Sequence, residues 1–347
     1  DFFKQISENS SVSYGYEFTH NKVKSRAFGV SLKRKDESLS NFKDLVYIEI
    51  PTRYPSGGSN YSTSAGYFDY RKSLSIKSNI NLGLRYTYTW LNARWNEEAL
   101  IDANLNYIKS NNESFTGSVG YVYRFEKNWQ ISTNFSSGFR SPNIDDIGKI
   151  RENKGVLSVP NQSLKPEYAY NSEISLSKFS QDKKNIFSIN LYYTHINNHI
   201  LRNSYSISND LSTIDPTTIL YNSEEVKTMA NVNFGNAYIY GGAFDVQSII
   251  FKNIFFKANV TSTKGGSISN DYNLPSISPL FGQFSLKFAG TDLKIQLSYR
   301  FSSSKSPLEY SDGGEDSIEE TPLLDLDDKG NKMFNGMPSW GVLKFSS

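Results

Sequence analysis

The residues best suited to chemistry lie just after an alternating segment that ends at Phe139. Arg140 can bind a carboxylate through two parallel hydrogen bonds, and prolines restrict the backbone at both ends of the segment that follows. The candidate acidic partners are Asp145, Asp146 and Glu167. Two interpretations remain open: these residues brace the rim of the fold among themselves, or they contact a ligand directly.

Histidine is scarce, with three residues at His20, His195 and His199. A spacing of four would suit a metal-binding pair on a helix. In an extended strand the same spacing corresponds to about 13 Å, which one metal ion cannot bridge. A bend after Thr194 would shorten that distance. We expect the histidines at the surface or in a belt of aromatic residues, and we predict no metal site.

The acidic segment at residues 325–330, DLDDKG, resembles the start of a calcium-binding loop with glycine at its sixth position. Lys329 occupies a ligand position, and Gly336 stands where such a loop places a bidentate glutamate. An ordinary solvated loop is therefore expected, although a weak calcium site of other geometry stays open.

Nucleophilic catalysis has few residues to use in this chain. It contains no cysteine, and its three histidines are scattered, so the hydrolase templates find no nucleophile and base at a recognisable spacing. His20 close to Glu17 is the one pairing that remains open. We predict no catalytic residue and no cofactor, and we do not expect an enzyme.

The elements that must position these residues are strands. Residues 80–90 alternate between large apolar side chains and small or polar ones, which places the two sets on opposite faces of a strand. Eleven residues are about what a tilted strand needs to cross a bilayer. Similar alternation predicts strands at 11–20, 26–34, 63–71, 80–90, 117–125, 128–139, 168–179, 185–197, 237–250, 254–263, 280–288 and 293–303, with a last one starting at 340–347.

The connections between these segments alternate in length. Short links at 21–25, 72–79, 126–127, 180–184, 251–253 and 289–292 are interleaved with long polar ones at 35–62, 91–116, 140–167, 198–236, 264–279 and 304–339. A soluble sandwich has no reason to keep such a rhythm. Short periplasmic turns and long extracellular loops produce it in a transmembrane β-barrel, so we expect the six long connections to be extracellular.

Composition agrees with a membrane barrel and excludes several other classes. The mean hydropathy of −0.50 and the lack of any long apolar run exclude a spanning helix, whereas barrel strands need only one apolar face. Aromatic residues make up 14% of the chain, as suits the aromatic girdles of such barrels. The net charge of +2 from 37 basic and 35 acidic residues argues against nucleic-acid binding.

The segment after the strand at 128–139 also carries a family resemblance. Residues 138–149, GFRSPNIDDIGK, and 159–168, VPNQSLKPEY, resemble the paired F-R-A-P and N-P-N-L-K-P-E motifs of TonB-dependent outer-membrane receptors, close to their haemoglobin, haem and transferrin receptor branch. Further similar landmarks are TRYP at 52–55, GLRY at 83–86, AYIYG at 237–241 and GMPSW at 336–340. The resemblance therefore covers nearly the whole chain.

The resemblance implies an all-β fold, an antiparallel transmembrane barrel of about 22 strands, of which this chain holds about 13. The plug domain and the TonB-contacting segment are expected to lie outside the chain, as are the last strands. The resemblance also adds residues of the motif loop to the candidate ligand-binding set. The full set is Arg140, Asn143, Asp145, Asp146, Lys149, Asn161 and Glu167. Haem receptors place a histidine ligand between the two motif halves, and this chain has none there, which argues against haem ligation by this loop.

The implied function is TonB-dependent uptake of a scarce nutrient across the outer membrane of a Gram-negative bacterium. The nutrient is expected to be iron-related: haem, a haem protein or an iron chelate. The implied partners are outer-membrane lipid, that extracellular ligand, and TonB acting through the plug. A passive porin or a barrel adhesin without a plug is the alternative, and a soluble β-sandwich or carbohydrate-binding module is a third.

Overall fold

The structure, a computed structural model, describes residues 1–32, 45–50, 52–95, 107–153, 155–207, 217–221, 224–268, 273–311 and 318–347. Thirteen antiparallel strands form one sheet, the large sheet, in which spatial order follows chain order, and this confirms the predicted strand number. Its strands are β1 (Phe2–Ser7), β2 (Ser10–Val23), β5 (Ser59–Ser75), β6 (Ser78–Arg94), β7 (Tyr107–Phe125), β8 (Trp129–Arg140), β11 (Glu167–Phe179), β12 (Ile186–Asn197), β16 (Ala237–Phe251), β17 (Ile254–Ser267), β18 (Phe281–Ala289), β19 (Lys294–Ser302) and β22 (Trp340–Ser346).

One member of this set differs from the sequence prediction. The segment predicted at 26–34 forms β3 (Ala27–Leu32), which pairs with β4 (Leu45–Ile50) in a separate two-stranded sheet. The first strand of the large sheet is instead β1, which the alternation had missed. The short link predicted at 21–25 is therefore wrong, because β2 connects to β5 through residues 24–58.

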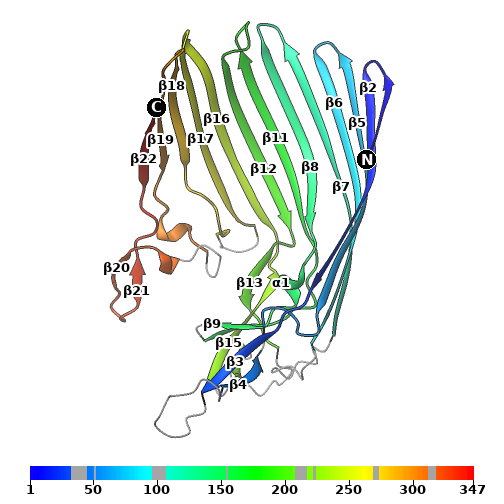
Figure 1. Cartoon of the computed structure of the whole chain (residues 1–347), viewed down its shortest axis with the longest axis vertical. Helices are drawn as coiled ribbons and strands as arrows, with labels where there is room; N and C mark the ends of the chain where they lie inside the picture. The colour runs from blue at the N-terminus through cyan, green and yellow to red at the C-terminus, as the bar shows by residue number, and fades with distance from the viewer. Residues whose placement is uncertain are drawn as a thin grey trace.

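The strands also extend further than their alternation predicted. β6 continues to Arg94 and β7 already begins at Tyr107, so the connection predicted at 91–116 is shorter in the structure. Short hairpin turns gather at one end of the large sheet and the longer connections at the other, as Figure 1 shows. Among the described residues, the connections at the second end carry the helices and strands that lie outside the large sheet.

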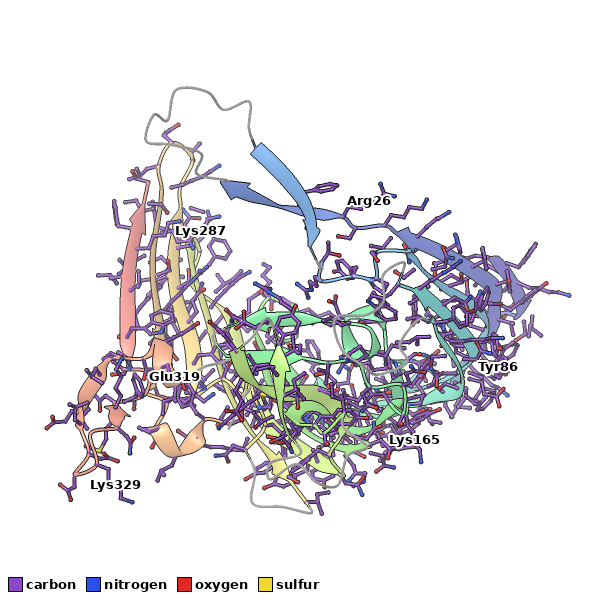
Figure 2. All side chains as sticks on the ribbon, turned by 90° about the horizontal axis from the view of Figure 1, so that it is seen from below. Arg26, Tyr86, Lys165, Lys287, Glu319 and Lys329 are labelled. Atoms are coloured by element: carbon purple, nitrogen blue, oxygen red, sulfur yellow. The ribbon has the colours of Figure 1, made fainter. Side chains whose placement is uncertain are left out.

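The two faces of the large sheet have opposite character. The sheet curves into an arc with Tyr86 on its convex side (Figure 2), where Leu84 and Tyr86 are 48% and 47% exposed. Odd positions of β6 face the other way, because side chains alternate along a strand. Arg85 there donates from Nη2 to Glu17 Oε2 at 2.9 Å. The convex face is thus apolar and the concave face polar.

A second sheet, the small sheet, is formed by the two connections that flank the β11–β12 hairpin. Its order is β13-β15-β10-β9, with β14 also on β15, and β10 runs parallel to β15. The small sheet lies on the concave side of the arc (Figure 2). Its strands are β9 (Arg151–Asn153), β10 (Val156–Ser158), β13 (Ile200–Ser204), β14 (Thr218–Tyr221) and β15 (Glu224–Asn233).

Hydrophobic packing attaches the small sheet and the loop residues beside it to the concave face of the large sheet. Leu91, Ala93 and Ile108 occupy positions that polar residues hold elsewhere on that face, and all three are buried against Ile147, Leu164 and Ile200. Within the small sheet a second cluster forms around Leu157, which is fully buried. Burial of each such side chain contributes about 1.5–3 kcal/mol, so this region is held by a conventional hydrophobic core.

The connection between β19 and β22 is built separately. It holds the 3₁₀ turns η2 (Pro307–Glu309) and η3 (Ile318–Glu320) and the hairpin of β20 (Leu323–Leu326) with β21 (Lys332–Phe334). In the described part of the chain, no helix is long and apolar enough to cross a membrane.

Candidate functional site

Arg140 and Glu167 stand opposite each other at the adjoining ends of β8 and β11. They form a cross-strand pair in the ladder between these strands, at positions that alternate onto the concave face. The predicted site therefore begins where β8 ends and the connection to β11, which contributes two strands to the small sheet, starts. The backbone ladder fixes both side chains at this rim.

Asn143 and Asp146 build the short helix α1 (Ile144–Ile147). The Asn143 side chain accepts hydrogen bonds from the amides of Asp145 and Asp146, at 2.8 and 3.1 Å. Asp146 returns the contact, since its Oδ2 accepts from the Asn143 amide at 3.0 Å. This capping box satisfies amides that would otherwise lack partners, so both residues shape the loop.

Asp146 is also the point where three segments converge. Its side chain is 4% exposed, and its Oδ1 accepts from Arg140 Nη2 and from Asn231 Nδ2 of β15 at 3.0 Å. Burial of a polar group is costly unless its oxygens accept hydrogen bonds, as those of Asp146 do. Asp146 therefore joins β8, α1 and the small sheet.

Asp145 pairs with a different segment, the TRYP landmark. Its Oδ1 accepts from Arg53 Nε at 2.6 Å, and its Oδ2 accepts from the Tyr54 hydroxyl at 3.2 Å. The hydrogen bond and the charge of Asp145 raise the pKa of Arg53 above its ordinary value, against a small opposing effect of burial. Two of the sequence landmarks thus meet in the structure.

Glu167 binds His199, which the sequence predicts at the surface or in a belt of aromatic residues. Its Oε2 accepts from His199 Nδ1 at 3.0 Å and from the Ile200 amide at 2.7 Å. Burial raises the pKa of the Glu167 carboxyl, but the two hydrogen bonds and the charges of His199 and Arg140 lower it more, so that the pKa lies below its ordinary value. Glu167 is the loop-side end residue of β11, beyond the ten or so residues that a strand needs to cross a bilayer.

His199 corrects the expectation of a surface or girdle histidine, because its side chain is 17% exposed. Asn198 adopts a left-handed conformation, with φ of 54°, which asparagine tolerates better than most residues. It lies directly after β12, so the chain turns just before His199 reaches Glu167.

The other two histidines lie on the convex face. His195 of β12 pairs across its ladders with Tyr170 and Tyr238. His20 Nδ1 lies 2.7 Å from the Ser62 hydroxyl, whereas Glu17 occupies the opposite face of β2 and binds Arg85. The pairing of His20 with Glu17 that the sequence left open is not formed.

Asn161 and Lys149 complete the set of seven. Asn161 is buried, with Nδ2 donating to the Asn231 carbonyl at 2.8 Å and Oδ1 accepting from the Ser163 amide and the Tyr205 hydroxyl. Lys149 has a pKa below its ordinary value, first because of burial and then because of positive charges nearby. Six of the seven predicted residues are engaged within the chain, which supports the bracing interpretation for them.

No metal-binding cluster is present in the described part of the chain. Its residues contain no group of three or more histidine, cysteine or acidic side chains placed to hold an ion. In the acidic segment between β20 and β21, Asp327 accepts hydrogen bonds from the Lys329 and Asn331 amides. That geometry is the local turn of an ordinary loop.

A meander of tilted antiparallel strands, apolar on its convex face and polar on its concave one, defines the class as a transmembrane β-barrel wall. The family model described as "TonB dependent receptor-like, beta-barrel" matches residues 2–343. The chain belongs to this family. No curated protein sequence matches it.

Solved structures show the same fold at low sequence identity. Copper transporter OprC is 14% identical with a TM-score of 0.68, over 98% of this chain and 45% of its own. The FrpB iron transporter from Neisseria meningitidis is 14% identical with a TM-score of 0.62, over 99% and 46%. The Serratia marcescens hemophore receptor HasR, in complex with its hemophore HasA and heme, is 12% identical with a TM-score of 0.62, over 86% and 50%. The chain spans about half the length of these proteins.

Proposed function

We propose that this chain forms part of the barrel wall of a TonB-dependent receptor, which takes up a scarce nutrient across the outer membrane of a Gram-negative bacterium. Membership of the receptor family supports this proposal. The observation that carries it furthest is the small sheet, packed on the concave face at the end with the long connections. A folded, polar-edged element at the mouth of a barrel suits selective capture better than free diffusion.

The proposal places the long connections outside the cell and the short turns in the periplasm. Because the chain contains no cysteine, cysteines introduced into it can test this orientation, with labelling of the unaltered receptor as the background. Lys329→Cys lies in a long connection, and Asp182→Cys lies in the turn between β11 and β12; both positions are exposed. A membrane-impermeant maleimide added to intact cells should label the first and spare the second, and the reverse pattern would invert the orientation.

The proposed nutrient is iron-related: haem, a haem protein or an iron chelate. The sequence resemblance supports this class, and the printed names of two structural neighbours refer to iron and to heme. A third refers to copper, so the metal needs its own test. A deletion strain grown on haemoglobin, haem or chelated iron as sole iron source should fail on at least one of them, and normal growth on all three removes the iron assignment.

Energy coupling separates the receptor from its alternative, a passive porin or adhesin. If the barrel works with a plug and TonB, uptake ceases when TonB is deleted, although ligand still binds to the cell surface. Uptake that continues unchanged in that strain favours the porin. The same cells test location, because the protein should sediment with the outer membrane and resist extraction without detergent.

A further inference from the structure

The guanidinium group of Arg202 in β13 is half-buried without a carboxylate beside it. Its Nη2 donates to the Ser158 hydroxyl of β10 at 3.0 Å. Its Nε is buried and has no hydrogen-bond partner among the described residues. Burial lowers the pKa of Arg202, and no acidic group offsets that effect. A buried cation destabilises a fold unless an anion pairs with it.

Two further cations lie near Arg202. Arg151 of β9 pairs across the ladder with Ser158, the same residue that accepts from Arg202. Lys149 precedes Arg151 by two residues, and its pKa is lowered by burial, then by the positive charges of Arg53, Arg202 and Arg151, with Asp145 opposing them in part. We call Lys149, Arg151 and Arg202 the basic cluster.

The nearby acidic groups are already committed to other partners. Asp145 binds Arg53 and Tyr54, and Asp146 binds Arg140 and an amide of β15. Glu152 neighbours Arg151 in sequence but accepts from the Gly155 amide.

Across the residues that the structure describes, no carboxylate lies within 4.0 Å of a cationic nitrogen of the basic cluster. The cluster therefore holds a surplus of positive charge that the described chain does not neutralise.

We propose that the basic cluster binds an oxyanion group, a carboxylate or a phosphate, on the ligand that enters from the end with the long connections. This inference rests on the proposed function, because it assumes that a solute reaches the concave side of the barrel. An arginine presents several N–H donors in a planar fork that matches both oxyanions, and Arg202 uses one of them on Ser158. The structure thus favours an acidic ligand over a neutral or cationic one.

The test uses the full-length receptor purified in detergent, with citrate and inorganic phosphate as probes in a calorimetric titration. Arg202→Gln should weaken binding by about tenfold or more, because hydrogen bonds between charged groups are the strong ones. Lys149→Gln should weaken it less, since a lysine acts as a point charge. Lys329→Gln is the control: it removes an exposed charge from the hairpin of β20 and β21, outside the small sheet, and should leave binding unchanged.

Thermal unfolding separates an anion site from a structural brace. Without a probe, Arg202→Gln should unfold at the same or a higher temperature than the unaltered receptor, because it removes an uncompensated cation. Citrate should raise the unfolding temperature of the unaltered receptor but not of the variant. A variant that unfolds earlier while its anion binding is unchanged marks Arg202 as a brace and overturns the proposal.

Two further results overturn the proposal: an unaltered receptor that binds neither probe, and a Lys329→Gln variant that loses binding as strongly as Arg202→Gln does. Growth on the iron sources is scored separately. A receptor that binds citrate but supports no iron-dependent growth keeps the anion site and removes the iron assignment. A receptor that supports such growth but binds no probe removes only the anion site.

Discussion

The large and the small sheet are stabilised in different ways. The large sheet has continuous backbone ladders between neighbouring strands, but its convex face leaves side chains such as Leu84 exposed, so it needs an apolar surrounding. The small sheet has short strands, yet its core residue Leu157 is fully buried. The stability of the large sheet therefore depends on the surrounding solvent, and that of the small sheet depends on its own packing. Substitutions at matched positions can distinguish these two contributions.

The largest effect is expected at Asp146, where the wall and the small sheet meet. Asp146→Ala removes the acceptor for Arg140 and Asn231 and opens the capping box of α1. The loss of two hydrogen bonds to a charged group and of a helix cap together costs about 3–5 kcal/mol. Urea unfolding of the full-length receptor, followed through the fluorescence of the nearby Trp95, should show this loss. An unchanged midpoint would contradict a joining role for Asp146.

Truncation of Ile108 tests the apolar seam between the two sheets. Ile108 is fully buried, so Ile108→Ala should lower the free energy of unfolding by about 2–5 kcal/mol. Leu84→Ala removes a side chain of similar size from the convex face and leaves no enclosed cavity. It should therefore change stability far less in the same urea titration, and equal losses would mean that the faces are wrongly assigned.

A charge placed on each face tests which one meets lipid. Leu84→Arg puts a guanidinium on the convex face of β6, which costs about 2–4 kcal/mol near the bilayer midplane. Ser132→Arg puts the same group on the concave face of β8. Ser132 lies opposite Ser175 of β11 in the ladder, and both serines line a cavity on that face. Assembly measured by heat-modifiable gel migration should fall for the first variant only.

Acidification tests the contact between Glu167 and His199. The folded state holds the pKa of Glu167 below its ordinary value of 4.5, so the unfolded chain binds a proton more readily. The contribution of Glu167 is complete above that value and is lost as pH falls through the lowered pKa. Urea midpoints measured across pH 6 to 3 should fall less steeply for Glu167→Gln than for the unaltered receptor.

The smallest effect is expected at the ion pair between Arg53 and Asp145. Both side chains are partly exposed, at 48% and 34%, and solvent-screened pairs of this kind contribute about 0–1 kcal/mol. Arg53→Gln should leave the urea midpoint almost unchanged at high salt. A loss as large as that of Asp146→Ala would mean that the TRYP landmark, and not α1, joins the loop to the wall.

Most strands of the large sheet could be predicted from the sequence, because the alternation of apolar and polar side chains is a property of each strand by itself. The same alternation cannot identify a strand's partner, so the segment of β3 was assigned to the wall although it pairs with β4. β1 was missed because Phe2 and Phe3 are adjacent and break the alternation. Pairing is decided by contacts between distant segments, which a local pattern does not encode.

The site was predicted in part. Asp146 does bind Arg140, and Glu167 does lie opposite it, whereas Asp145 binds Arg53. The missed partners, Asn231 and His199, stand 85 and 32 residues away along the chain from the carboxylates that they bind. One residue does indicate the packing between the two sheets from the sequence: Leu91 is apolar although its position in β6 alternates onto the polar concave face. Direct ligand contact by the seven predicted residues stays a prediction.

The parallel pairing of β10 with β15 has a consequence for receptor engineering. It joins the connection before the β11–β12 hairpin to the connection after it, through pairs such as Leu157 with Thr228. A graft that exchanges one of these connections with another receptor would leave half of a sheet without its hydrogen-bonding partner. Transplanted specificity would therefore require both connections to be moved together, as one cassette with the hairpin between them.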